Sequence, residues 1–212
     1  MKKLIKVMTV VLFMAGCGRG TMPQESPEAT GKAGYTFTNS VQLETKPADM
    51  SGYHWLYDPS PAFAEISFAD SVRMFTENGT GILYYGRTNC PWCQRAVPIL
   101  DEAAQEAGLT VYYIDATVPI ALKEDGEVDQ QKSTEIYNQL VDQIKEILPQ
   151  DENGNYNFQI PEVIAVKDGK IVGHHLSLVD DFTLTDEEAQ MSEEQQAELK
   201  KIYEEMIRSI AD

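Results

Sequence analysis

The hydrophobic and polar positions along the chain predict alternating helices and strands from about residue 66 onward. Residues 67–70, SFAD, have the capping-box pattern, and apolar residues follow them at helical spacing, which predicts a short helix. The turn Asn78-Gly79 ends this helix. Residues 82–85 are an apolar run bounded by glycines, as expected for a buried strand.

The next elements continue the alternation. A helix is expected to begin at the Cys-Pro-Trp-Cys stretch and to end near Ala107, because Gly108 is a typical helix stop. Residues 109–114, LTVYYI, predict the next strand. The helix between the two strands favours their parallel pairing.

The C-terminal half contains a helix, a hairpin and a final helix. Within the segment 116–157, apolar residues repeat at helical spacing up to Pro149 (Ile136, Leu140, Ile144, Ile147). Asp168-Gly169 lies between two apolar runs and predicts a β-hairpin. Residues 180–191 are acidic and predict a loop. The capping-box pattern at 192–195 precedes a helix with one apolar face (Leu199, Ile202, Tyr203, Met206, Ile210).

Composition narrows the functional classes. The 212 residues include 17 Lys and Arg against 34 Asp and Glu, which gives a formal charge of −17. Nucleic acid is therefore excluded as an expected partner, because phosphate binding needs a basic surface.

The N-terminus has the pattern of an export signal. Three lysines precede an apolar run from Val7 to Ala15 that is too short to span a bilayer. The run ends in Met14-Ala15-Gly16-Cys17, which resembles the lipobox of bacterial lipoproteins. The resemblance implies a signal peptide at 1–16, lipidation of Cys17, and a lipid-anchored protein on the extracytoplasmic face of the cell membrane. The alternative is a plain signal peptide or an uncleaved anchor with an incidental cysteine.

Two segments separate this signal from the main domain. Residues 17–34 are rich in Gly, Pro, Ser, Thr and Glu, and predict a flexible tether. Residues 35–63 contain the strand-like stretch YTFTNSVQLET and an aromatic patch (Tyr53, Trp55, Leu56, Tyr57). We expect them to form an N-terminal extension that packs on the domain.

The main chemical candidate is the pair Cys90 and Cys93. If Cys90 lies where the strand ends and the helix begins, the free N–H groups and the helix dipole stabilise its thiolate. Pro91 suits the first helical position, and Cys93 lies one turn further along the same face. A disulfide between the two is then geometrically easy. The order strand, C-x-x-C, helix is a redox signature, although a zinc site and an inert buried pair remain alternatives.

The region 64–212 resembles proteins of the thioredoxin-like fold. Cys90-Pro91-Trp92-Cys93 is similar to the glutaredoxin-type pair, Pro98 matches the proline in the thioredoxin active-site helix, and Ile160-Pro161 resembles the family's cis-proline segment. The resemblance implies an α/β fold with a central mixed sheet flanked by helices, here with an N-terminal extension and a helical insertion at 116–157. A narrower resemblance is to secreted thioredoxin-like proteins called bacteriocin transport accessory proteins.

The resemblance also implies an activity. The chain would be an extracytoplasmic thiol–disulfide oxidoreductase in which Cys90 is the nucleophile and Cys93 resolves the mixed disulfide. Trp92, the backbone of Ile160 and Pro161 would contact the substrate. Its partners would be protein or peptide thiols and disulfides, with a membrane electron carrier or a small thiol to recycle the pair, and no cofactor or metal is required. The alternative is an accessory lipoprotein that binds a secreted peptide.

Several residues near the motif are ambiguous. Tyr84 stands where thioredoxins carry a buried acid, so deprotonation of Cys93 would depend on water or on another carboxylate, for which Glu162 is a candidate. A solvated strand position is the expectation for Glu162, and a helix-surface position for Arg95. His174 and His175 are expected to point to opposite faces of a strand.

Overall fold

The computed structural model describes residues 34–212. The predicted signal peptide at 1–16, the lipidation site Cys17 and all but the last residue of the tether at 17–34 lie outside the described residues.

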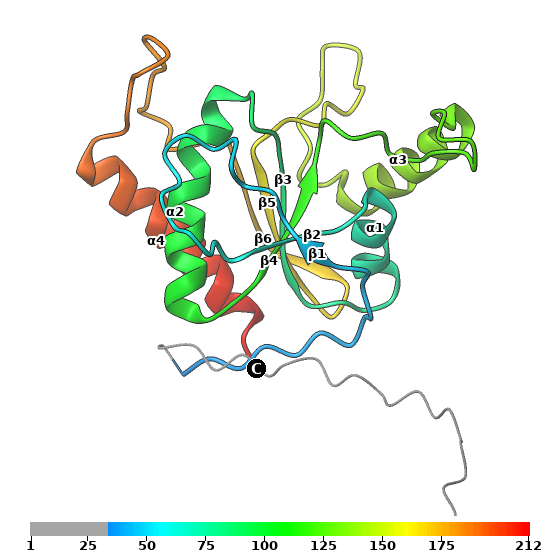
Figure 1. The fold of residues 1–212 in the computed structure, drawn as a ribbon, viewed down its shortest axis with the longest axis horizontal. Helices are drawn as coiled ribbons and strands as arrows, with labels where there is room; N and C mark the ends of the chain where they lie inside the picture. Colours follow the sequence, from blue (N-terminus) through cyan, green and yellow to red (C-terminus); the bar gives the residue numbers. More distant parts are fainter. Residues whose placement is uncertain (1–33) are drawn as a thin grey trace, which may run out of the picture.

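The centre of the molecule is a six-stranded mixed β-sheet (Figure 1). Three neighbouring strands run parallel, and the remaining strands pair antiparallel with them or with each other. Across the sheet the order is β1 (Lys46–Pro47), β2 (Phe63–Glu65), β4 (Val111–Asp115), β3 (Gly81–Gly86), β5 (Glu162–Lys167) and β6 (Lys170–Leu176). The parallel pairing of β3 and β4 expected from the sequence is confirmed.

Two helices cover each face of this sheet (Figure 1). On one face lie α2 (Pro91–Ala107) and α4 (Glu193–Ile210), and on the other α1 (Phe68–Thr76) and α3 (Gln130–Ile144). The expected signals begin and end these helices: Ser67 and Ser192 accept N-cap bonds, and Gly108 closes α2 at φ +68°.

Strand β3 divides the hydrophobic core into two clusters. All six of its residues are buried, and alternate side chains point to opposite faces. Ile82 and Tyr84 join the cluster under α2 and α4, whereas Leu83 and Tyr85 join the cluster under α1 and α3.

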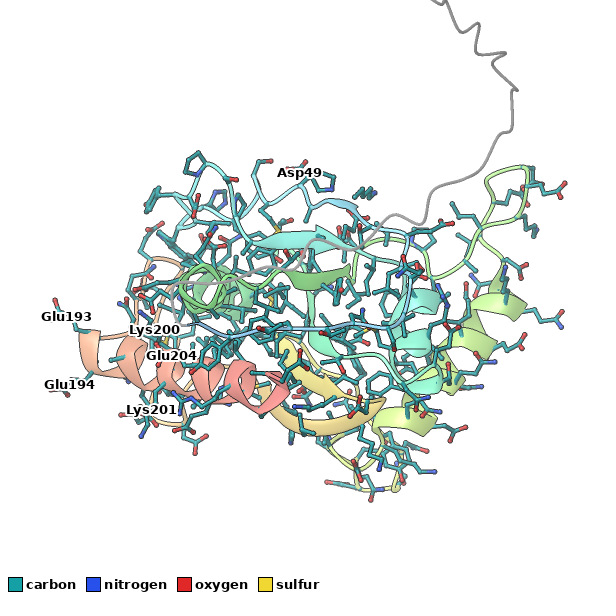
Figure 2. All side chains as sticks on the ribbon, turned by 90° about the horizontal axis from the view of Figure 1, so that it is seen from below. Asp49, Glu193, Glu194, Lys200, Lys201 and Glu204 are labelled. Carbon is teal, nitrogen blue, oxygen red and sulfur yellow. The ribbon has the colours of Figure 1, made fainter. Side chains whose placement is uncertain are left out.

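The two helices of the first face are also joined by charges at the surface. Lys200 of α4 lies 2.7 Å from Glu102 and 2.9 Å from Glu106, both on α2. Figure 2 shows Lys200 and Glu204 along α4, with Glu193 and Glu194 at its outer end, directed away from the sheet. Exposed ion pairs of this kind contribute little stability, so apolar packing dominates the contact.

The N-terminal extension differs in part from expectation. It packs on the domain as predicted, with Val41, Met50 and Tyr53 buried. However, residues 35–45 form no strand, and the extension pairs with the sheet through β1, which is two residues long. In the insertion, the predicted helix ends at Ile144, before Ile147.

Candidate functional site

Cys90 occupies the N-cap of α2, at the end of the loop that follows β3. Its backbone is extended, and its sulfur accepts a hydrogen bond from the Cys93 N–H at 3.3 Å. A hydrogen bond from the Cys93 thiol is the largest cause that lowers the pKa of Cys90 from 9.0 to about 6. Burial opposes this shift, while the N–H groups of Cys93 and Trp92 and the positive charge of Arg87 add to it.

Cys93 lies one turn further along α2 in a different environment. Its side chain is fully buried against the sheet. Burial, followed by the adjacent Cys90, raises the pKa of Cys93 far above its ordinary value. The two sulfurs are not linked to each other, so the pair presents one acidic thiol beside one that holds its proton.

The substrate-binding residues expected from the sequence lie beside Cys90. The Ile160–Pro161 peptide bond is cis, and the Ile160 carbonyl oxygen lies 3.9 Å from the Cys90 sulfur. Trp92, with 42% of its surface exposed, forms part of the adjacent groove. This groove has a volume of about 630 Å³, and its lining is mostly apolar with one cation (Arg87, Trp92, Ala116, Phe158, Gln159, Ile160, Leu176, Ser177).

Tyr84 lies beneath Cys93, on the side of β3 that faces α2. Its side chain is fully buried in the same hydrophobic cluster as Cys93, and the Cys93 thiol is among the groups that raise the pKa of Tyr84. The Tyr84 hydroxyl is 3.2 Å from that of Tyr53, which the N-terminal extension supplies. Burial raises the pKa of both phenols, so they are neutral hydrogen-bonding groups at neutral pH.

Arg95 is not a surface residue, as the sequence suggested, because two distant segments cover it. Only 3% of it is exposed. Its guanidinium donates to the carbonyls of Ala189 at 2.6 Å and Glu187 at 2.8 Å, and also to that of Pro91 at 2.7 Å. It also stacks over the Trp55 ring at 4.5 Å. Arg95 thereby holds the acidic loop and the extension against the first turn of α2.

Gln94 is a second anchoring residue, and sequence reasoning missed it. Its amide nitrogen donates to the Gly52 carbonyl at 2.7 Å and to the Thr88 carbonyl, and its oxygen accepts from the His54 N–H at 2.7 Å. All three partners belong to segments before the helix, so the helical pattern around Gln94 carried no signal for this role.

Glu162 is buried, which corrects the expectation of a solvated strand residue. It is 1% exposed, and burial raises its pKa to about 8. Alternation along β5 places it on the face of Ile164, opposite the face that holds Cys93. The geometry therefore does not support Glu162 as the base for Cys93.

The two histidines of β6 lie on opposite faces, as expected. His174 Nδ1 is 3.2 Å from Glu162 Oε1, and burial lowers the pKa of His174, so this contact joins a protonated carboxyl to a neutral imidazole at neutral pH. His175 packs edge-on against Tyr203 of α4, with the ring centroids 5.9 Å apart.

Residues 34–212 hold no group of three or more His, Cys, Asp or Glu side chains arranged to bind a metal ion. None of the helices in this part of the chain has the length and apolar character needed to cross a membrane.

Comparisons with known proteins do not assign the chain to a family. No protein-family model matches the sequence, and no curated protein matches it either.

Proposed function

We propose that the protein is a thiol–disulfide oxidoreductase with a thioredoxin-like fold that exchanges disulfides with secreted or envelope proteins. We further propose that Cys17 carries a lipid anchor and holds it on the extracytoplasmic face of the cell membrane. The mixed sheet with two helices on each face is compatible with this fold. The C-x-x-C pair at the start of a helix is its redox signature.

The observation that carries the proposal is the difference between the two thiols. With a pKa of about 6, Cys90 is mostly thiolate at pH 7, and the thiolate is the attacking species in disulfide exchange. Cys93 is buried and protonated one turn away, which suits a thiol that reacts only after its neighbour has.

The reaction follows from this arrangement. The Cys90 thiolate attacks one sulfur of a substrate disulfide; the substrate S–S bond breaks, and the other sulfur leaves as a thiolate. Cys93 then loses its proton and attacks the Cys90 sulfur. The Cys90–Cys93 disulfide forms, the second substrate thiolate leaves, and the substrate has gained two electrons. A membrane electron carrier or a small thiol reduces the pair again. The reverse sequence would oxidise a substrate dithiol.

The groove beside Cys90 supplies the site for the substrate chain. The carbonyl of Ile160 is next to the reacting sulfur, where an extended peptide could pair with it as an added strand. Trp92 presents an exposed aromatic face to the same groove, and Arg87 contributes a positive charge at its edge. A peptide with an apolar residue near its cysteine fits this lining.

Trapping of mixed disulfides tests the proposal. The Cys93→Ser variant should accumulate disulfides between Cys90 and substrate proteins, because the resolving thiol is missing. Cys90→Ser should form no adducts, and its rate of turnover should be lower by several orders of magnitude. Non-reducing electrophoresis after acid quenching measures the adducts, and Asn89→Ala, an exposed change beside the motif, is the control. A Cys93→Ser variant without adducts, in a cell whose wild-type protein cycles between oxidised and reduced forms, would count against the proposal.

The alternative function is an accessory lipoprotein that uses the same groove to hold a secreted peptide. The exposed, mostly apolar groove is the observation that favours it. A double variant, Cys90→Ser with Cys93→Ser, separates the two functions. An accessory binder keeps its effect on secretion in this variant, whereas an oxidoreductase loses it.

A further inference from the structure

Three buried tyrosines meet beneath the cysteine pair. Tyr53 comes from the N-terminal extension, Tyr84 from β3 and Tyr113 from β4, and each is at most 2% exposed. The Tyr53 hydroxyl donates to the Tyr113 hydroxyl at 3.4 Å, so the Tyr84 hydroxyl is the donor in its 3.2 Å bond to Tyr53. The rings of Tyr84 and Tyr113 are stacked, with centroids 5.5 Å apart and an angle of 21° between them. The cluster is thus ordered by both stacking and hydrogen bonds.

Strand β3 leaves space for the Tyr84 hydroxyl at its C-terminal end. Gly86 ends β3, and a Cβ atom at this position would lie 2.2 Å from the Tyr84 hydroxyl oxygen. The Tyr84 side chain therefore runs along the strand toward its C-terminal end, where α2 begins with the cysteine pair. This direction points its hydroxyl toward Cys93, which is buried in the same cluster.

We propose that Tyr84 is a catalytic residue whose hydroxyl turns from Tyr53 and donates a hydrogen bond to the Cys93 sulfur as this thiol becomes a thiolate, and that Tyr53 is a positioning residue that then donates to the Tyr84 oxygen. The inference rests on the proposed function. In the resolving step, the Cys93 proton passes to solvent or to the leaving substrate sulfur. The thiolate, held by the phenol, then attacks Cys90 and forms the internal disulfide. The N-terminal extension thereby completes the redox site.

A phenol in this place acts differently from a carboxylate. It keeps its own proton at neutral pH, so it supplies a hydrogen bond to the thiolate but no negative charge that would oppose it. The titratable groups near Cys93 are another thiol and four phenols, contributed by α2, β3, β4, α4 and the extension (Cys90, Tyr84, Tyr113, Tyr203, Tyr53). The Arg87 backbone N–H also lowers the pKa of Cys93, whereas the Arg87 charge acts on Cys90. Removal of the Tyr84 hydroxyl should therefore raise the pKa of Cys93.

The two steps can be timed separately with Ellman's reagent. The full chain is reduced in a Cys17→Ala background, so that Cys90 and Cys93 are the reacting thiols. Attack by Cys90 releases the first equivalent of coloured thiol, and attack by Cys93 on the mixed disulfide releases the second. Tyr84→Phe should slow the second phase about 10-fold, the effect of losing one hydrogen bond to a charged group. The rate of the first phase should stay within about twofold of the wild-type rate.

The variants of the neighbouring tyrosines provide the comparison. Tyr53→Phe should slow the second phase by less, about two- to threefold, because the Tyr84 hydroxyl is present but less well oriented. Tyr85→Phe, the adjacent change on the opposite face of β3, should alter neither phase. In Tyr84→Phe, the pH profile of the second phase should also move to higher pH.

The outcomes separate this inference from the function on which it rests. A wild-type protein that releases no second equivalent contradicts the proposed function. A wild-type protein that releases both, together with a Tyr84→Phe second phase equal to that of Tyr85→Phe, overturns the role of Tyr84. Equal slowing of both phases in Tyr84→Phe also overturns it, because a general structural defect then explains the result. If Tyr84→Phe does not fold, a wild-type second phase in Tyr53→Phe contradicts the inference.

Discussion

Tyr84 and Tyr85 are adjacent in β3, equally buried, and opposite in their surroundings. Tyr84 faces α2, and its hydroxyl is hydrogen-bonded to that of Tyr53 in the cluster that also holds Cys93. Tyr85 faces α1, between the rings of Phe68 and Phe158 at 6.0 Å and 5.1 Å. Among the described residues its hydroxyl has no hydrogen-bond partner, although Ser71, which donates to the Phe68 carbonyl, is close by.

This difference separates a residue that packs from a residue with a chemical role. A buried hydroxyl costs free energy unless it is hydrogen-bonded, and phenylalanine would fill the same space without that cost. At Tyr85 the ring alone explains the residue. At Tyr84 the hydroxyl has a partner in Tyr53, and Gly86 leaves room for it. The two faces of β3 thus differ in whether the tyrosine hydroxyl is hydrogen-bonded.

The largest effect on the cysteine pair is expected when a side chain fills the space that Gly86 leaves for the Tyr84 hydroxyl. In Gly86→Ala, the new methyl group would overlap the Tyr84 hydroxyl, so the ring must shift away from Cys93. Overpacking of this kind should lower the free energy of unfolding by about 1–3 kcal/mol. It should also slow the resolving step at least as much as Tyr84→Phe does. Urea denaturation and the two-phase thiol release measure these effects.

Gly173→Ala is the matched control for this change. A Cβ at Gly173 of β6 would lie 3.4 Å from Met206 and 3.8 Å from Ala165, which is close to ordinary contact. This variant should retain most of the stability and both phases of thiol release. If Gly86→Ala behaves like Gly173→Ala, Tyr84 is not held where the structure places it.

A pH-dependent effect is expected at Glu162, the ionisable residue of the opposite face. The carboxyl has a pKa of about 8 in the folded protein against 4.5 as its ordinary value. The folded protein therefore binds more protons than the unfolded chain between these values, and stability falls as pH rises from 4.5 to about 8. Glu162→Gln removes this loss, and should raise the free energy of unfolding by an amount that grows as pH rises from 4.5 to 8.

The pH dependence identifies the cause of this gain. Denaturant unfolding at pH 4.5 and pH 8 should show a clear gain for Glu162→Gln only at the higher pH, because near the lower one the carboxyl is protonated in the folded protein and only half ionised in the unfolded chain. Glu152→Gln, in an exposed loop, should change stability at neither pH. An equal gain at both pH values would mean that packing, and not the buried charge, explains it.

The elements that were predictable from sequence have local signals. The N-caps Ser67 and Ser192, the C-cap Gly108 and the turn at Asp168-Gly169 each depend on a few neighbouring residues, and the structure contains all four. The placement of Cys90 at the start of a helix was predictable for the same reason. Short-range chemistry was therefore sufficient for the framework and for the placement of the cysteine pair.

The features that sequence reasoning missed depend on contacts between distant segments. Arg95 looked like a helix-surface residue because its partners, Glu187 and Ala189, lie more than ninety positions away. Glu162 follows the polar pattern of a strand end, yet neighbouring elements bury it. Residues 35–45 have strand-like alternation but form no strand, because residues other than a neighbouring strand provide their contacts. A sequence pattern reports the local preference of a segment, whereas these three outcomes depend on the distant segments that pack against it.

The smallest effect, and the most direct test of the comparison, is expected from the two phenol hydroxyls. Tyr85→Phe removes a buried hydroxyl without a partner and should leave the free energy of unfolding unchanged or raise it by up to about 1 kcal/mol. Tyr84→Phe should lower it by about 1 kcal/mol, because Tyr53 loses a hydrogen bond. Parallel urea titrations of the two reduced variants measure the difference. Equal destabilisation by both would mean that the Tyr85 hydroxyl does bond, with Ser71 as its partner, and the two faces of β3 would then differ only in the sulfur that lies above one of them.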